Sequence, residues 1–564
     1  MKKMFLVCLC FVMILTGCSF GNAGTDLGVV GLSYYDEMGE EGYNTDLFYR
    51  NDLSTRGADP GVVYISEGEY EGYFFLYGSD DFNSRGYSAI KSKDLVSWEF
   101  VGECFIPEDD SWGVSSMWAP EVIYDEDSGK YYMFYSATNT NQEDGYVNCK
   151  YLGLAVADKP EGPFVQYTGT NANGTEIGIG DPLFNIEFLG KDHPLYKEGT
   201  SFIDPKPFVD PETGDKYMYM CRNRNAHKTN IICVVKMKDW ATPDYSTYTE
   251  LTTVNRTTYN GDVATERTEG DINEGPWMIY HEGKYYLTMS INSTSEKEYS
   301  VIQAIGDSPM GPFEKIQESK GGVVLGVDLD WDHVSVAGGQ SFAYIGDELY
   351  IVYHQNRDRE MGGDMNRGYA IDRIEWVENE DGQTVMKANG PTNSIQPKPS
   401  AYTGYENLAK KAKVTATNVI KDSDAKYLND GAVRIQEVDC VQEFYGKNKV
   451  KITMEFDDYV TAKSLLIYNS CFYEDSFYEV DKIDFSFRKE VDGKMSTGIA
   501  RAENLYYDFE ENAMVHYGLM RPGAPMILEF EELEINKVTI TVTCPKGQER
   551  VGISEIMLLG KEAK

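Results

Sequence analysis

A turn followed by an apolar-aromatic strand recurs five times along the 564-residue chain, and this repeat most constrains the fold. The copies lie at 71–79, 129–137, 214–222, 283–291 and 346–354, about 60–85 residues apart. That spacing accommodates four strands with their loops. Because such a unit cannot bury both faces of its sheet alone, the units must stack. Radial stacking predicts an all-β, five-bladed β-propeller, whereas one flat sandwich rarely uses so many strands.

The strand before each repeated phrase opens with polar residues. These openings are 58–61, 118–121, 203–206, 274–277 and 338–341. In a propeller the first strand of each blade lines the central axis, so the five openings should meet at one mouth of the channel. Three of them carry the carboxylates of Asp59, Asp204 and Glu274. Asp-Pro alone is a common turn dipeptide, but equivalent positions in a repeat indicate a shared pocket.

Composition narrows the chemistry that such a pocket can perform. The formal net charge of −39 opposes binding to nucleic acid or to an anionic membrane surface. The 41 Tyr and 53 Gly favour short strands and tight turns, and flat tyrosine faces also suit sugars. The sequence contains no Gly-x-Ser-x-Gly, phosphate-loop or His-Glu-x-x-His motif. Carboxylates around a sugar-sized pocket suit glycoside hydrolysis, which needs a proton donor and a base or nucleophile. A third acid can raise the pKa of the donor.

These motifs resemble those of glycoside hydrolase family 43. The matching phrases are Ala58-Asp59-Pro60, Trp118-Ala119-Pro120-Glu121, the Ile203-Asp204-Pro205 segment and Glu274-Gly275-Pro276, within about residues 50–395. The resemblance implies a five-bladed propeller of inverting enzymes, chiefly arabinofuranosidases, arabinanases, β-xylosidases and some galactanases. It implies that Asp59 is the general base, Glu274 the general acid, and Asp204 the residue that tunes and orients the acid. Gly275 and Pro276 would direct Glu274 into the pocket.

Further residues are predicted around the substrate. Trp118 and Trp277 either stack on sugar rings or pack in the core, and both interpretations stay open. His354 is predicted to form part of the pocket wall, and Arg367 to reach sugar hydroxyls. Many family members carry a histidine that helps to hold an axial calcium ion, and here Gln340 stands at the corresponding position. We therefore expect no required cofactor and no metal ligand, with calcium left as an alternative.

The N-terminus predicts export and a lipid anchor. Lys2 and Lys3 precede an apolar run too short to span a bilayer, and Leu15-Thr16-Gly17-Cys18 resembles the bacterial lipoprotein box. We expect a signal peptide at 1–17, lipidation at Cys18 and a tether over 18–35. The expected location is extracytoplasmic, on the bacterial cell membrane through the anchor only. A monomer is expected.

The C-terminal part predicts a second β domain. We assign 36–395 to the propeller, a proline-containing linker to 388–405, and 396–564 to a β-sandwich. Strand patterns and the ending at 551–561 resemble the galactose-binding-like, discoidin-type module. Whether it binds glycan or braces the propeller stays open.

The sequence thus predicts an inverting exo-glycosidase that removes arabinofuranosyl or xylosyl units from plant polysaccharide fragments. One alternative is a surface lipoprotein that binds glycan without catalysis. Another is a retaining, fructosidase-like propeller. That family uses Asn-Asp-Pro and Glu-Cys phrases, whereas this chain has Ala58-Asp59-Pro60 and Glu274-Gly275.

Overall fold

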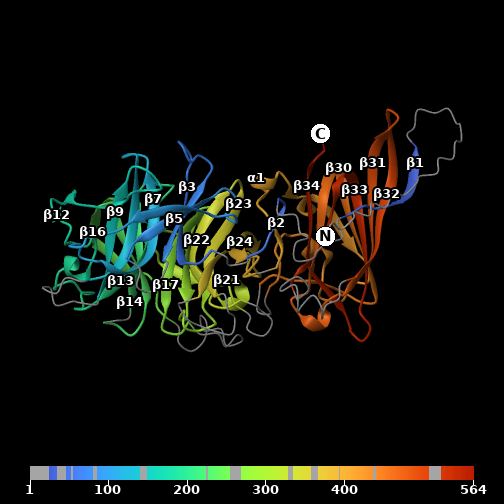
Figure 1. The fold of residues 1–564 in the computed structure, drawn as a ribbon. Helices are drawn as coiled ribbons and strands as arrows, with labels where there is room; N and C mark the ends of the chain where they lie inside the picture. Colours follow the sequence, from blue (N-terminus) through green and yellow to red (C-terminus); the bar gives the residue numbers. More distant parts are fainter. Residues whose placement is uncertain are drawn as a thin grey trace, which may run out of the picture.

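The computed structural model is nearly all β, with a propeller beside a further β-rich region (Figure 1). It describes residues 25–34, 46–51, 55–79, 85–139, 149–223, 226–254, 269–327, 334–356, 366–392, 394–435, 440–506 and 523–563. The predicted signal peptide and Cys18 lie outside these ranges. No helix within them is long and apolar enough to cross a membrane.

Five antiparallel sheets form the five predicted blades. Blade 1 contains β3 (Ala58–Tyr64), β4 (Phe74–Ser79), β5 (Tyr87–Ser92) and β6 (Glu99–Phe105). Blade 2 contains β7 (Ser115–Asp125), β8 (Lys130–Thr138), β9 (Lys150–Ala157) and β10 (Val165–Gln166). Blade 3 contains β13 (Ser201–Val209), β14 (Lys216–Asn223), β15 (Ile231–Asp239) and β16 (Thr242–Glu250). Blade 4 contains β17 (Asn273–His281), β18 (Lys284–Ile291), β19 (Ser300–Gly306), β20 (Phe313–Lys315) and β21 (Val323–Leu325). Blade 5 contains β22 (Gly338–Ile345), β23 (Glu348–Asn356), β24 (Arg367–Glu378) and β25 (Thr384–Ala388).

The repeated aromatic phrases are the second strands of the blades, β4, β8, β14, β18 and β23. Both faces of these strands are covered by neighbouring blades, which explains their nearly continuous apolar character. Five hydrophobic clusters fill the five gaps between blades. One of them joins Phe74 and Leu76 of blade 1 to Tyr350 and Val352 of blade 5, so it closes the ring.

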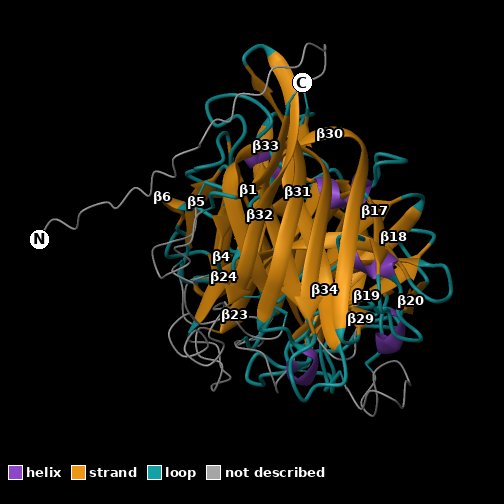
Figure 2. Ribbon diagram, turned by 90° about the vertical axis from the view of Figure 1, so that its right-hand side faces the viewer, coloured by secondary structure: helices purple, strands orange, loops and turns teal. Residues whose placement is uncertain are grey.

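The C-terminal region is built on one nine-stranded sheet (Figure 2). Its path runs β1 (Asp26–Gly31), β32 (Lys494–Tyr506), β31 (Glu479–Val491), β33 (Pro525–Thr543), β30 (Lys449–Asn469), β34 (Val551–Glu562) and β27 (Glu406–Asn407). Two more strands pair at its sides, β28 (Lys413–Ala416) and β29 (Phe444–Gly446). A separate core of aliphatic and phenylalanine side chains lies on this sheet.

Two segments differ from their predicted roles as tether and linker. Residues 26–31, placed in the tether, form β1 and pair in parallel with β32. Of residues 388–405, expected to be a linker, most of those that the structure describes up to residue 399 are buried. Within them β26 (Gln396–Pro397) pairs with β2 (Phe48–Tyr49), and α1 (Ser400–Thr403) follows. Ile395 and Phe48 join a cluster with Leu466 and Met557 of the C-terminal sheet. Apolar side chains among the prolines therefore make this connection part of an interface.

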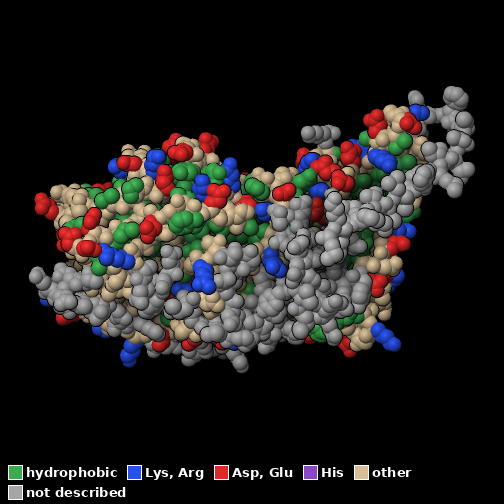
Figure 3. Space-filling view, viewed as in Figure 1, with side chains coloured by type: hydrophobic (Ala, Val, Ile, Leu, Met, Phe, Trp, Pro, Cys, Tyr) green, Lys and Arg blue, Asp and Glu red, His purple; other side chains and the backbone are tan. Residues whose placement is uncertain are grey.

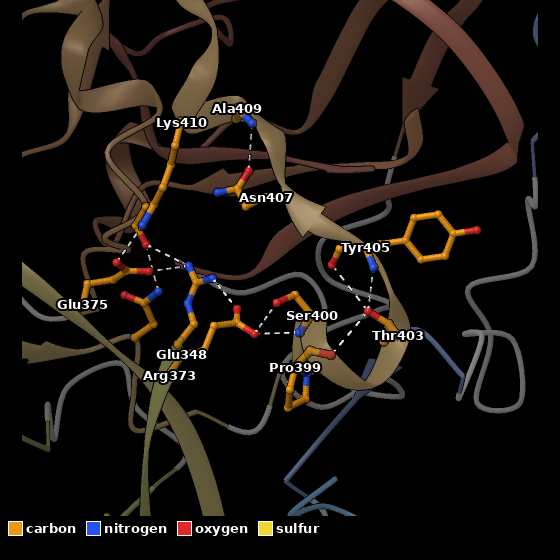
Figure 4. Close-up of polar contacts among 12 residues, drawn as sticks. Glu348, Arg373, Glu375, Pro399, Ser400, Thr403, Tyr405, Asn407, Ala409 and Lys410 are labelled. Atoms are coloured by element: carbon orange, nitrogen blue, oxygen red, sulfur yellow. Dashed lines mark hydrogen bonds and ion pairs between the residues drawn. The ribbon is translucent and has the colours of Figure 1, made fainter. Parts of the chain in front are cut away.

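A polar network completes that interface (Figure 4). Arg373 of blade 5 contacts Glu348 at 3.3 Å and Glu375 at 2.5 Å, and it donates to the backbone carbonyl of Gly431. Lys410 of the C-terminal region binds the other oxygen of Glu375 at 2.7 Å. Ionic and apolar contacts thus join the propeller to the C-terminal sheet. Other charges are interspersed over the outer surface, as one face of the molecule shows (Figure 3).

Candidate active site

The first strand of each blade carries a residue in the left-handed region within its first five residues. These residues are Asp59 (φ 49°), Ala119 (45°), Asp204 (55°), Gly275 (56°) and Gly339 (59°). At each of them the register between the first and second strands shifts. Only Gly adopts this conformation readily, so Asp59, Ala119 and Asp204 store strain of order 1 kcal/mol each. The bulge redirects the chain, so that neighbouring side chains can both face the axis.

The blade starts surround one cavity of about 410 Å³. Its wall includes Asp59, Asp204 and Glu274, which confirms that the repeat brings residues distant in sequence together. Relative to the left-handed residues, Glu274 stands one position earlier than the two aspartates. Both positions reach the cavity, because Ala58, Trp118 and Ile203 line it beside their left-handed neighbours.

Glu274 is held at both carboxylate oxygens. The Asn230 side-chain amide donates to Oε2 at 2.9 Å, and the Tyr299 hydroxyl donates to Oε1 at 3.0 Å. Removal from bulk water raises the pKa of Glu274 well above its ordinary value, and the nearby charge of Asp204 raises it further. The two donors favour the ionised form and only partly offset this rise. Glu274 can therefore hold a proton at neutral pH. When it gives up that proton, the two donors stabilise the carboxylate that is left.

Asp204 interacts electrostatically with both of the other acids. Its Oδ2 accepts from the backbone N–H of Gly275 at 2.9 Å, so it also fixes the residue that follows Glu274. Burial and the charge of Asp59 raise the pKa of Asp204, while Lys206 and Lys150 oppose the rise. The left-handed conformation of Gly275 places this N–H toward Asp204.

Asp59 has the most polar surroundings of the three. The Ser79 hydroxyl donates to its Oδ2 at 3.0 Å, and Arg367 Nη1 lies 3.7 Å from its Oδ1. Its backbone N–H donates to Nδ1 of His354 at 3.1 Å. Its side chain remains 23% exposed, so a water molecule can approach it from the cavity.

A second set of residues, three of them not predicted from the sequence, lies around the acids. Lys150, Asn230, Tyr299 and Arg367 all stand at or one residue before the third strand of their blades. Antiparallel neighbours alternate in direction, so third strands begin at the same rim as first strands. Of these four only Arg367 was predicted. The repeat itself was the signal that could have found the others.

The two predicted tryptophans lie in different places. Trp118 lines the cavity, and the Lys150 ammonium sits 3.3 Å from the centroid of its ring. Trp277 is not among the residues that line the cavity; its ring packs 6.1 Å from Phe342 and 5.0 Å from Lys206 Nζ. Lys206 also pairs with the buried Glu121. Of the two predicted tryptophans, Trp118 alone borders the cavity.

Gln340 and His354 also lie behind the cavity wall. Both side chains are fully buried. Gln340 donates to the Gly275 carbonyl at 2.7 Å and to Thr288 Oγ1 at 3.1 Å, and its Oε1 accepts from Ser290 at 2.9 Å. Calcium requires six to eight oxygen ligands. Because both ends of the Gln340 amide are already engaged within the protein, this position does not fit a calcium ligand.

One group of side chains has the proximity of a metal site. Ligand atoms of Asp204, Cys221 and Glu274 lie within 4.8 Å of one another. Burial, and then the charges of both acids, raise the pKa of the Cys221 thiol well above its ordinary value, so it stays protonated. Its Sγ donates to the Asn273 carbonyl. The thiol hydrogen is committed to a backbone carbonyl, and the other two members of the group are the acids already described on the cavity wall.

The sequence and structure resemble known glycosidases. The model of glycosyl hydrolases family 43 matches residues 51–382. A β-D-galactofuranosidase of Aspergillus niger is 25% identical over 316 residues, covering 54% of this chain and 75% of the relative. A β-xylosidase of Xylanibacter ruminicola is 26% identical over 298 residues, covering 46% and 79%. A xylosidase/arabinosidase of Bacteroides ovatus is 24% identical over 307 residues, covering 49% and 79%.

Among solved structures, a thermostable family-43 glycoside hydrolase is 29% identical, with a TM-score of 0.48, and the match covers 62% of this chain and 99% of that one. The family match spans more than half of the chain and contains all five blades' first strands. With the three carboxylates gathered at the propeller axis, the chain belongs to glycosyl hydrolases family 43.

Proposed function

We propose that the protein is an inverting, exo-acting glycosidase that releases arabinofuranosyl or xylosyl units from plant polysaccharides or oligosaccharides. One observation carries the proposal: three carboxylates in one cavity have three different surroundings. An inverting enzyme needs a protonated acid on one side of the bond and an ionised base on the other. The raised pKa of Glu274 supports the acid role, and Asp59, with its polar partners and its exposure to the cavity, is placed to receive a proton from water.

The acid step belongs to Glu274. Its proton passes to the glycosidic oxygen as the bond from that oxygen to the anomeric carbon breaks. The resulting carboxylate is stabilised by the Asn230 and Tyr299 donors that are already in place. Such donors need no rearrangement when charge develops. Asp204 keeps the proton on Glu274 before the reaction, through its negative charge and its bond to Gly275.

The base step belongs to Asp59. Ser79 and the His354-held backbone orient its carboxylate, and Arg367 lies beside it. A water molecule that donates a proton to Asp59 would attack the anomeric carbon from the face opposite Glu274. The two carboxyl groups are then expected to lie roughly 6.5–9.5 Å apart.

The sugar class follows from the cavity and the relatives together. A volume of about 410 Å³ lies at the lower end of the range for ligand pockets and suits a terminal sugar rather than a long chain. Trp118 offers an aromatic face, and Arg367 offers donors to hydroxyl groups. Relatives named as xylosidases or arabinosidases favour pentoses, while the galactofuranosidase makes a furanose ring the wider alternative.

A panel of nitrophenyl glycosides tests the proposal: α-L-arabinofuranoside, β-D-xylopyranoside, β-D-galactofuranoside and β-D-fructofuranoside. We expect turnover of one or both pentosides and its loss in the Asp59→Asn variant. Binding of xylan or arabinan oligosaccharides without any release would favour a glycan-binding protein. Cleavage of the fructoside alone would favour the retaining alternative. Either result would contradict the proposal.

A further inference from the structure

Tyr299 contacts Glu274, the proposed acid, and His354, which binds the backbone of the proposed base. It is 2% exposed and stands immediately before β19 in blade 4. Its hydroxyl donates to Glu274 Oε1 at 3.0 Å. Its ring lies flat against the imidazole of His354, with centroids 5.7 Å apart and planes 8° apart. One side chain therefore contacts the proposed acid at its tip and a residue of blade 5 along its face.

His354 carries this contact to the proposed base. It is fully buried, and its Nδ1 accepts the backbone N–H of Asp59 at 3.1 Å. Its Nε2 lies 3.3 Å from Arg367 Nη1. Burial and the Arg367 charge depress the pKa of His354 well below its ordinary value, so the ring remains neutral and can accept. Asp59 holds a strained left-handed conformation, which a fixed acceptor for its N–H helps to maintain.

We propose that Tyr299 is a positioning residue that fixes Glu274 relative to Asp59, through its hydroxyl on one side and its stacked ring on the other. The inference rests on the acid and base roles proposed above. Inversion demands that the acid and the base face each other across a single sugar. A link of two stacked rings between their blades meets that demand.

The hydroxyl has a second effect that a purely structural residue would lack. A donor to a carboxylate stabilises the ionised form, so Tyr299 lowers the pKa of Glu274 against burial. Besides Tyr299, the groups that interact electrostatically with Glu274 include Asp204, Asp59 and Cys221, and Lys206 and Arg367 line the same cavity. Loss of the hydroxyl leaves those groups in place. The pKa of Glu274 should then rise, and the alkaline limb of kcat/KM, which reports the protonated acid, should move upward.

The first experiment compares Tyr299→Phe with wild type on a pentoside with a poor leaving group. We expect the alkaline limb to move up by about one pH unit, because a hydrogen bond to a charged group has roughly that effect. At neutral pH we expect kcat to fall about 10-fold, with little change in KM, since one of two orienting donors is lost. An unmoved limb, or an equal loss at every pH, would overturn the proposal.

Tyr285→Phe is the matched control. Tyr285 lies in the same blade and donates to Asp210 Oδ1 at 2.9 Å, so its loss also removes a tyrosine–carboxylate bond. Neither Tyr285 nor Asp210 lines the cavity, whereas Tyr299 and Glu274 do. This variant should keep the wild-type pH profile and rate.

Tyr299→Leu tests the stacked ring. On a dinitrophenyl glycoside the leaving group needs no proton, so Tyr299→Phe should be nearly as active as wild type. Tyr299→Leu should be at least 10-fold slower there, because Asp59 loses its support. Circular dichroism checks that the variant is folded. If the folded Leu and Phe variants are equally active on this substrate, the stacked ring does not position Asp59, and the proposed link is contradicted.

A substrate-free measurement separates this inference from the proposed function. Glutamate labelled with carbon-13 at its side-chain carboxyl carbon is incorporated into the protein and followed by NMR. The Glu274 signal is assigned by its absence in Glu274→Gln. Its titration midpoint should rise in Tyr299→Phe relative to wild type. If wild type cleaves no substrate of the panel, the proposed function fails while this titration still decides the role of Tyr299. Identical midpoints would refute it.

Discussion

Two buried carboxyl groups of the propeller have nearly the same partners and different surroundings. Glu274 accepts from a tyrosine hydroxyl and a side-chain amide at the axis. Asp372, in blade 5 next to the linker, accepts from the Tyr353 hydroxyl at 2.6 Å and the Gln396 amide at 2.6 Å, with Thr392 as a third partner. Burial raises the pKa of both. Glu274 borders a cavity, whereas Asp372 is fully enclosed.

A raised pKa therefore does not by itself mark a catalytic acid. Asp372 is packed so closely that a Cβ on Gly390 would lie 2.0 Å from its Oδ2. No substrate can approach it, so its hydrogen bonds serve to join blade 5 to the segment leading into the C-terminal sheet. Glu274 can exchange its proton with a ligand because one side of it opens on the cavity. Access, added to the same polar chemistry, separates the two roles.

Replacing Glu274 should produce the largest effect. Glu274→Gln removes the proton donor, so activity on a polysaccharide or alkyl glycoside should fall by about 10²–10⁴-fold. The loss should be much smaller on a dinitrophenyl glycoside, whose phenolate leaves unaided. Steady-state kinetics on both substrates measure the difference.

The other two acids provide the contrast. Asp59→Asn should impair both substrates, because water must be activated whichever group leaves. Asp204→Asn should lie between, since it acts through Glu274. Equal losses for Glu274→Gln on good and poor leaving groups would move the acid role elsewhere.

Replacing Asp372 should affect stability rather than catalysis. In Asp372→Asn one carboxylate oxygen is replaced by an amide NH2 group, which faces hydrogen-bond donors and cannot accept from them. The free energy of unfolding should therefore fall by about 1–3 kcal/mol. The rate per folded molecule should stay near that of wild type. Urea unfolding and active-fraction kinetics measure the two quantities. A selective loss of kcat in a fully folded variant would contradict the purely structural role of Asp372.

The smallest expected effect is a gain in stability from Glu274→Gln. The folded-state pKa of Glu274 is raised, so the folded state binds more protons than the unfolded state above an ordinary glutamate pKa. Stability therefore declines as pH rises toward the folded-state pKa. A neutral Gln should relieve this cost by about 1–2 kcal/mol at pH 8 and by almost nothing near pH 4.

Thermal unfolding at several pH values measures this gain. The exposed Glu314 in the same blade supplies the control, and Glu314→Gln should show no such pH-dependent gain. A stabilisation by Glu274→Gln that is equally large at pH 4 would contradict the assigned cause.

Much of this arrangement could be predicted from the repeat. A recurring aromatic strand identified the blades, and the polar openings before it identified the axial acids. The offset of Glu274 by one position could not be predicted, because it depends on which residue of each opening adopts a left-handed conformation. Asn230 and Tyr299 were missed because each precedes a third strand, where no charged motif draws attention. The linker was misjudged because prolines suggested exposure, while Ile395 and Gln396 beside them are buried.

The anomeric configuration of the first product distinguishes inversion from retention. Proton NMR during the first minutes of hydrolysis of an aryl pentoside records the anomer before it equilibrates in water. We expect the inverted anomer first, because Asp59 activates water on the face opposite Glu274. Appearance of the retained anomer first would mean that a carboxylate attacks the sugar itself, and would contradict the assigned roles of Asp59 and Glu274.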